Sequence, residues 1–264
     1  MNTTVARIPL LAALFVVASC TATATTRDVE AEASVPRTTA TTTVVSVAEA
    51  QTTSSLAPTS TAQVSTTTEA KAPPSEPPPS FTATVSSVDA DDLGSSWRPG
   101  CPVDPEDLRL IEVTHWNNSG QPVTGQLVAH ESASADLVQV FRRLFDVGFT
   151  IERMELVQNY DGDDDLSMAA NNTSAFNCRE VAWRPGVWSL HAYGLAIDIN
   201  PLLNPYVSAT RLLPPEGAQY ADRGLQVAGM IHGDGPVVEA FASVGWGWGG
   251  YWASGKDYQH FDRR

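Results

Sequence analysis

The stretch Ser189-Leu-His-Ala-Tyr-Gly-Leu-Ala-Ile-Asp-Ile-Asn200 places polar side chains inside an otherwise apolar run. His191 and Asp198 stand seven residues apart, which puts them on opposite faces of a straight strand or about two turns apart along a helix. The backbone must therefore bend, and Gly194 can take the positive φ of a tight turn. Residues 195–199 then indicate a short buried strand with one carboxylate, and a buried carboxylate needs a partner.

A second polar pair lies in residues 246–262, which are rich in glycine and tryptophan and contain Asp257 and His260. Neutral imidazole and carboxylate suit Zn²⁺, and three protein ligands leave a fourth position for water. His191, Asp198 and His260 would supply that set. Asp257, three residues before a ligand, would be the base that takes a proton from water. In the plainer alternative, Asp198 caps a turn and His191 is a satisfied core histidine.

These residues carry a family resemblance. Ser189-x-His191-x-x-Gly194-x-Ala196-x-Asp198, followed by Asp257-x-x-His260, resembles the zinc D-alanyl-D-alanine carboxypeptidase-like family. That family includes vancomycin-resistance-type carboxypeptidases and L-alanyl-D-glutamate endopeptidases. The resemblance extends over roughly residues 100 to 262 and implies the roles just given: three zinc ligands, and Asp257 as catalytic acid/base.

The chain departs from the family at the substrate-binding arginine that relatives often carry in a Ser-Gly-Tyr-Arg-Ser run. Asn177 stands where that arginine would be, and Arg179, two positions later, is the expected substitute. Its planar fork suits a carboxylate, which stem peptides of peptidoglycan carry at their free ends and at D-glutamate. Ser189 is expected to hydrogen-bond the substrate backbone.

The first twenty residues predict an export signal, with one basic residue, an apolar run and then Cys20. Residues 17–20 resemble the lipobox of bacterial lipoproteins, in which the cysteine becomes the lipidated first residue. We expect a cell-envelope lipoprotein anchored to the bacterial membrane at Cys20; the alternative is ordinary cleavage near Ala22 or Ala24 and secretion. Residues 21–95, dominated by Thr, Ser, Ala and Pro, predict a disordered tether.

Residues 96–264 then form one domain, long enough for one sizeable core. The formal net charge of −14 argues against a nucleic-acid partner, and we expect a monomer. Cys101 and Cys178 remain as an even pair in an exported domain, where a disulfide can form; two buried free thiols are the alternative.

The predicted fold class is α+β, a small antiparallel sheet flanked by helices in a single zinc peptidase domain. Residues 108–115 and 149–157 indicate strands, and residues 136–148 indicate a helix that Gly148 can end. A short helix is expected after Gly235, with Pro236 in its first turn. The acidic run 161–165 lacks the pattern of a calcium loop and predicts a solvated turn.

The expected function is zinc-dependent hydrolysis of peptidoglycan stem peptides, with D-alanyl-D-alanine as the preferred bond. Cleavage between L-alanine and D-glutamate is the first alternative. A non-catalytic lipoprotein that binds wall peptides is the second, although a pure binder does not need Asp257 beside a complete ligand set. Hydrolysis of a non-peptide amide stays open.

Overall fold

The computed structural model describes residues 78–263. The predicted leader and most of the predicted tether lie outside these residues. Helices, short 3₁₀ turns and strands follow one another along the chain in the order β1 Ala83–Ser87, α1 Ala90–Leu93, η1 Gly94–Ser96, η2 Pro105–Asp107, β2 Leu108–Trp116, β3 Pro122–His130, α2 Glu131–Asp146, η3 Val157–Tyr160, α3 Asp164–Ala169, η4 Leu190–Tyr193, β4 Ala196–Asp198, β5 Tyr206–Val207, β6 Leu212–Leu213, η5 Pro215–Ala221, α4 Pro236–Ala242, β7 Gly247–Trp248, η6 Gly249–Tyr251, β8 Lys256–Asp257 and β9 His260–Asp262.

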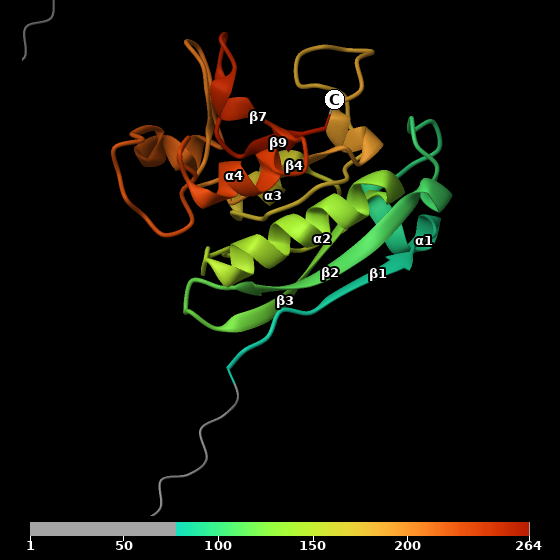
Figure 1. Ribbon diagram of the computed structural model, residues 1–264. Coiled ribbons are helices and arrows are strands. Elements are labelled where there is room, and N and C mark those ends of the chain that lie inside the picture. Colours follow the sequence, from blue (N-terminus) through green and yellow to red (C-terminus); the bar gives the residue numbers. More distant parts are fainter. Residues whose placement is uncertain (1–77, 264) are drawn as a thin grey trace, which may run out of the picture. The chain divides into compact units, whose positions relative to one another are not determined.

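The strands form three small antiparallel sheets, in the orders β1-β2-β3, β4-β9-β7 and β6-β5-β8. The predicted α+β class is confirmed, with three sheets in place of one. In Figure 1, α2 lies between the first sheet and the layer that holds α4, β4, β7 and β9. No helix among the described residues is both long and apolar enough to cross a membrane.

Helix α2 buries the predicted stripe of Leu137, Val140, Phe141 and Leu144 completely, or nearly so. These side chains share a core with residues of β2, β3, α4, β4, β7 and β9, so this one helix joins the two layers. The helix ends at Asp146, and the N–H groups of the next two turn residues bond back to carbonyls of its last turn. Gly148, at φ 70°, occupies the left-handed position that such an ending requires.

The second sheet separates the core from the polar site by the alternation of side chains along its strands. Ile197 pairs with Phe261, and both are fully buried in the core. The next pair, Asp198 and His260, therefore points to the opposite face. Phe241 of α4 stacks on Phe261, with ring centroids 4.0 Å apart, and supports the sheet from below the site.

Several local predictions are confirmed, among them the strand at 108–115 and the short helix α4 with proline in its first turn. The strand predicted over residues 149–157 is wrong. Only isolated bridges involve Thr150 and Arg153 there, and the buried residues are Ile151, Met154 and Val157. A spacing of three does not fit the two-residue repeat of a strand, so the segment packs its apolar residues on the core as irregular chain.

The domain boundary at residue 95 is also corrected. Strand β1, within the predicted tether, pairs with β2 in a register that joins Ala83 to Val113 and Ser87 to Arg109. Asp89 then caps α1, and Leu93 of that helix is buried in a second apolar cluster. The ordered domain thus includes residues before 95, because Val, Thr and Ser form an edge strand as readily as a linker.

Candidate metal centre

Local turn geometry places His191. Ser189 caps the 3₁₀ turn η4 by accepting a hydrogen bond from the N–H of His191, at 3.3 Å. Gly194 ends the turn in the left-handed conformation, φ 64°, as predicted. The carbonyl of Gly194 also accepts from the N–H of His130, at 3.0 Å, and a Cβ on Gly194 would collide with that backbone. A glycine is needed here for both reasons.

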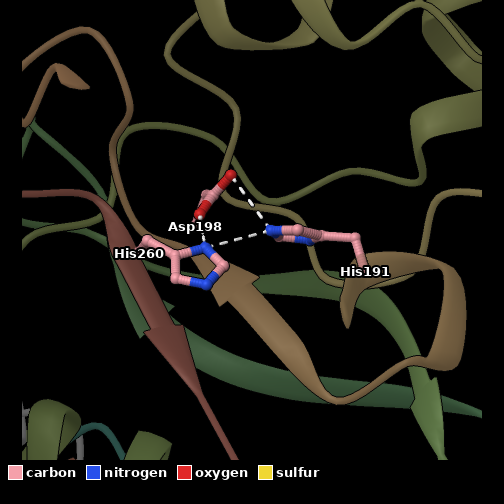
Figure 2. A group of neighbouring side chains, drawn as sticks. All are labelled: His191, Asp198 and His260. Atoms are coloured by element: carbon pink, nitrogen blue, oxygen red, sulfur yellow. Dashed lines mark hydrogen bonds and ion pairs between the residues drawn. The ribbon is translucent and has the colours of Figure 1, made fainter. Parts of the chain in front are cut away.

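Three donor atoms converge in the manner predicted for a metal (Figure 2). Nε2 of His191 lies 3.3 Å from Oδ2 of Asp198 and 3.3 Å from Nδ1 of His260, which in turn lies 2.9 Å from Oδ1 of Asp198. All three residues are buried. They are the only group of three or more such ligand residues gathered in this way within residues 78–263.

The spacing and chemistry of this set fit zinc. Ligands at about 2.0–2.2 Å from one tetrahedral ion lie roughly 3.3–3.6 Å apart. Two of the three distances agree with that range, and the third is the length of a charge-assisted hydrogen bond. Two imidazoles and one carboxylate also provide the N and O ligands that zinc takes, with one tetrahedral position left for water or substrate.

Partners outside the set fix which ring nitrogens face the metal position. The carbonyl of Ala175 lies 2.6 Å from Nδ1 of His191, so that nitrogen donates to the carbonyl and Nε2 faces the metal position. Oδ2 of Asp262 lies 3.4 Å from Nε2 of His260 and plays the same role on the other ring. The sequence interpretation missed Asp262, although its position two residues after His260 puts both on one face of β9.

The pKa values of Asp198 and His260 are shifted by the neighbouring side chains, so that a metal ion and protons compete for this site. Burial alone would raise the pKa of Asp198, but the charges and hydrogen bonds of His191 and His260 hold it well below its usual range. Burial alone would lower the pKa of His260, but hydrogen bonds with Asp198 and Asp262 and nearby negative charge raise it to about 10. The carboxylate is thus ready to bind a cation, and a cation must displace a proton from His260.

Asp257 stands next to this set but outside it. Burial raises the pKa of Asp257 to about 7, against the opposing charges of His260 and Arg179 and a hydrogen bond from the side chain of Gln259. Its Oδ1 is buried and without a hydrogen-bond partner. A carboxyl with a pKa near neutrality can both accept and return a proton, as the predicted acid/base role requires.

Two more unpartnered atoms accompany that oxygen. Among the described residues, only four buried side-chain N or O atoms lack a hydrogen-bond partner, and Asp257 Oδ1, Arg179 Nε and Gln259 Oε1 are three of them. Asp257 Oδ1 is an acceptor beside the metal position, and Arg179 Nε is a donor in a side chain whose charge acts on Asp257. Buried polar atoms are rarely left unpaired, so this group fits a site that a polar ligand completes.

Arg179 and Ser189 are neighbours across a loop, since the N–H of Ser189 bonds the carbonyl of Arg179 at 3.1 Å. Nη2 of Arg179 pairs with Oδ2 of Asp164 at 2.9 Å, which fixes one side of its fork. Asn177 does not serve as a substitute for the arginine of the family motif, because its side-chain amide donates to the carbonyl of Gly162 at 3.2 Å. Arg179 therefore is the cation that the structure brings near Asp257.

The predicted disulfide between Cys101 and Cys178 is present, with the two Cα atoms 5.8 Å apart. It joins residues 77 positions apart and holds the chain directly before Arg179. Around the disulfide, Leu93, Leu108 and Phe176 form part of the second apolar cluster. The bridge thus anchors the segment that carries the cation to a core distinct from that of α2.

The remaining histidines have other places. The side chain of His130 caps α2 by accepting from the N–H of Ser132, and His115 is buried within β2. His232 lines a separate cavity of about 300 Å³ with Arg223 and Trp248. None of the three belongs to the gathered set.

The predicted acidic turn at 161–165 contains Asp163, which caps α3, and Asp164, which pairs with Arg179.

In the glycine- and tryptophan-rich segment, Trp246 and Trp248 pack in the core. The ring centroid of Trp252 lies 5.3 Å from that of His260. A Cβ on Gly249 would collide with Asp257. The glycine thus lets the chain pass close to its own site residues.

A comparison with protein families adds one finding. Residues 182–263 match the family described as D-alanyl-D-alanine carboxypeptidase, and this supports the resemblance seen in the sequence. The matched part holds the three gathered ligands and Asp257, and it begins after Arg179. That family is one of zinc-dependent peptidases. No curated protein and no solved structure gives a significant match to the chain.

Proposed function

We propose that this protein, whose residues 182–263 match the D-alanyl-D-alanine carboxypeptidase family, is a zinc peptidase that cleaves D-alanyl-D-alanine at the end of peptidoglycan stem peptides. The observation that carries the proposal is the buried convergence of His191, Asp198 and His260 with Asp257 beside them. A binder would need neither a metal set nor a carboxyl of near-neutral pKa next to it.

Each residue of the site has a separate task in the proposed reaction. His191, Asp198 and His260 would hold Zn²⁺, which supplies Lewis acidity that polarises a peptide carbonyl and lowers the pKa of water. Asp257 accepts a proton from the attacking water and returns it to the amine that leaves. Water adds across the amide in this way, and the products are a carboxylic acid and an amine.

Arg179 provides the reason for naming the terminal bond first. A carboxypeptidase must recognise a free carboxylate one residue beyond the cut, and a guanidinium recognises carboxylates by paired hydrogen bonds. Asp164 occupies one nitrogen of Arg179, and the buried Nε is without a partner. The same cation would suit the side carboxylate of D-glutamate, so cleavage after L-alanine is the second candidate.

The products distinguish these candidates. The zinc-loaded protein is incubated with a pentapeptide stem that ends in D-alanyl-D-alanine, with the same peptide as a C-terminal amide, and with intact peptidoglycan. Release of one alanine from the acid but not from the amide supports the carboxypeptidase, and separation of L-alanine from D-glutamate supports the endopeptidase. Bound zinc without cleavage of any of the three favours a peptide-binding protein.

We propose further that the protein is exported and anchored in the cell envelope by lipid on Cys20, where its substrate lies. The support is the sequence of residues 1–20 alone. A Cys20→Ser variant is expected to move from the membrane fraction to a soluble or secreted fraction. A native protein without lipid at Cys20 would contradict the anchor.

A further inference from the structure

Two hairpin loops rise beside the metal centre, one that begins at Arg179 and one that pairs with the strand of Asp257. The first spans residues 179–189 and is closed by a bridge between Glu180 and Trp188. The second is β5–β6, and β5 also pairs with β8 so that Tyr206 lies opposite Asp257. Figure 1 shows both loops projecting away from α2, on the side of β4 and β9. The first hairpin thus begins at Arg179, and the second lies against the strand that carries Asp257.

The tips of the same hairpins touch. The guanidinium carbon of Arg211 lies 3.6 Å from the ring centroid of Trp183. Residues 182–187 are all exposed, and Trp183 keeps 57% of its surface open to solvent. The contact is therefore not part of a core. Trp183 also has φ 62°, a left-handed conformation that is uncommon for a bulky side chain.

These features need an explanation other than packing. An exposed cation–π contact is weak, and a large aromatic ring at a loop tip gains little by burial when most of it stays in water. Backbone strain of this kind concentrates at binding and switch sites. Here the strained residue belongs to the loop that begins at Arg179, four residues after the cation that would hold the substrate carboxylate.

We propose that Trp183 and Arg211 form a clasp that closes the substrate site beyond the carboxylate held by Arg179, and so favours peptides with a free carboxyl end. The inference rests on the proposed function and names its specificity. A peptide that ends at the carboxylate fits beneath the closed clasp. A chain that continues past it must part the two side chains, because Trp183 belongs to the loop of Arg179 and Arg211 to the hairpin beside the strand of Asp257.

The test uses two peptides that differ only beyond the cut. One is the pentapeptide stem that ends in D-alanyl-D-alanine, and the other is the same peptide extended by two glycines. Cleavage of each is followed by mass spectrometry to give kcat/KM. Binding of each is measured by calorimetry in an Asp257→Asn background, which does not depend on turnover.

Trp183→Ala and Arg211→Ala are each expected to raise kcat/KM and affinity for the extended peptide by about two- to fivefold, the range that corresponds to an exposed cation–π contact. Values for the free-ended peptide should not change, since Arg179 is unchanged. Arg142→Ala is the matched control. It removes an arginine stacked 4.6 Å from the ring of Phe81, outside the site, and should alter neither peptide.

The outcomes separate the two claims. If the variants lose activity and affinity equally on both peptides, the pair only supports the loop and the clasp is overturned. If the wild-type protein cuts neither peptide, the proposed function fails, and calorimetry decides about the clasp. In that case the clasp is overturned if both variants bind the extended peptide as the wild-type side chains do. It is also overturned if no variant binds either peptide.

Discussion

Nε2 of His260 lies 3.4 Å from Oδ2 of Asp262, on the side of the ring that faces away from Asp198. The two residues share one face of β9, so the strand itself sets their relationship. The carboxylate holds the ring with Nδ1 toward the other ligands. A metal site on this sheet therefore depends on a residue that is not a ligand.

Asp262→Asn should weaken zinc binding by about 10- to 100-fold, because partners that orient a ligand histidine have effects of that size. The amide keeps the shape of the side chain but loses the charge that favours the ring orientation and its basicity. Competition with a coloured chelator measures the affinity. Asp146→Asn, an exposed change at the end of α2, is the control, and equal affinities in the two variants would contradict the role of Asp262.

The ligands and the base should respond differently to substitution. His260→Ala removes one of three ligands and is expected to abolish stable zinc binding. Asp257→Asn should retain zinc and lose about 10²- to 10⁴-fold in turnover, the usual contribution of a general acid/base. Metal analysis after gel filtration and assays of the same samples give both quantities. Full zinc content in His260→Ala would refute the ligand assignment.

Zinc affinity should depend strongly on pH. The pKa of His260 is raised to about 10 in the metal-free protein, so at neutral pH the ring carries a proton that zinc must displace. The dissociation constant is thus expected to fall by about tenfold for each pH unit between about 6 and 9. Chelator competition across that range measures the slope, and an affinity independent of pH would count against displacement of this proton.

The raised pKa of His260 also affects the stability of the metal-free protein, which should decrease with rising pH while zinc affinity increases. A raised pKa means that protonation of His260 stabilises the folded state fully below the ordinary value of 6.5, and this contribution is lost as the pH rises through about 10. Protein stripped of metal by a chelator should therefore have a lower melting temperature at pH 10 than at pH 7. Zinc-loaded protein should lack this particular loss, because its His260 is held neutral by the metal.

The disulfide should matter for the stability of the segment before Arg179. A bridge across 77 residues contributes roughly 4 kcal/mol in the chain-entropy treatment. Reductant is expected to lower the melting temperature of the wild-type protein and to leave a Cys101→Ser/Cys178→Ser variant unchanged. Two alkylated thiols in unreduced protein from its native compartment would show that the bridge does not form there.

The sequence predicted that His191, Asp198 and His260 lie together, as the structure shows; the turn between the first two is a local feature, whereas the approach of His260 followed from the motif resemblance. Gly194 had to turn the chain between His191 and Asp198, and the structure places it in the left-handed conformation expected. Asp257 and His260 are near each other on any backbone. The periodic stripe of α2 was equally readable, since Leu137 and its neighbours repeat at the helical spacing.

Contacts between segments that are distant in the sequence could not be predicted in the same way. Strand β3 pairs with β2 over its whole length, yet Pro122 and Gly125 interrupt its strand pattern in the sequence. Composition misled at β1, which has the residues of a tether and the register of an edge strand. The contact of Trp183 with Arg211 joins two loops whose approach no local pattern encodes.

The most direct test of the central claim is the release of alanine from a D-alanyl-D-alanine pentapeptide by protein that has been stripped of metal and then reloaded with zinc. The stripped protein should release none, and the reloaded protein should release one alanine per peptide. His260→Ala should stay inactive after the same treatment, because its ligand set is incomplete. Activity that persists without metal, or zinc bound through His260 with no peptide bond cut, would contradict the account.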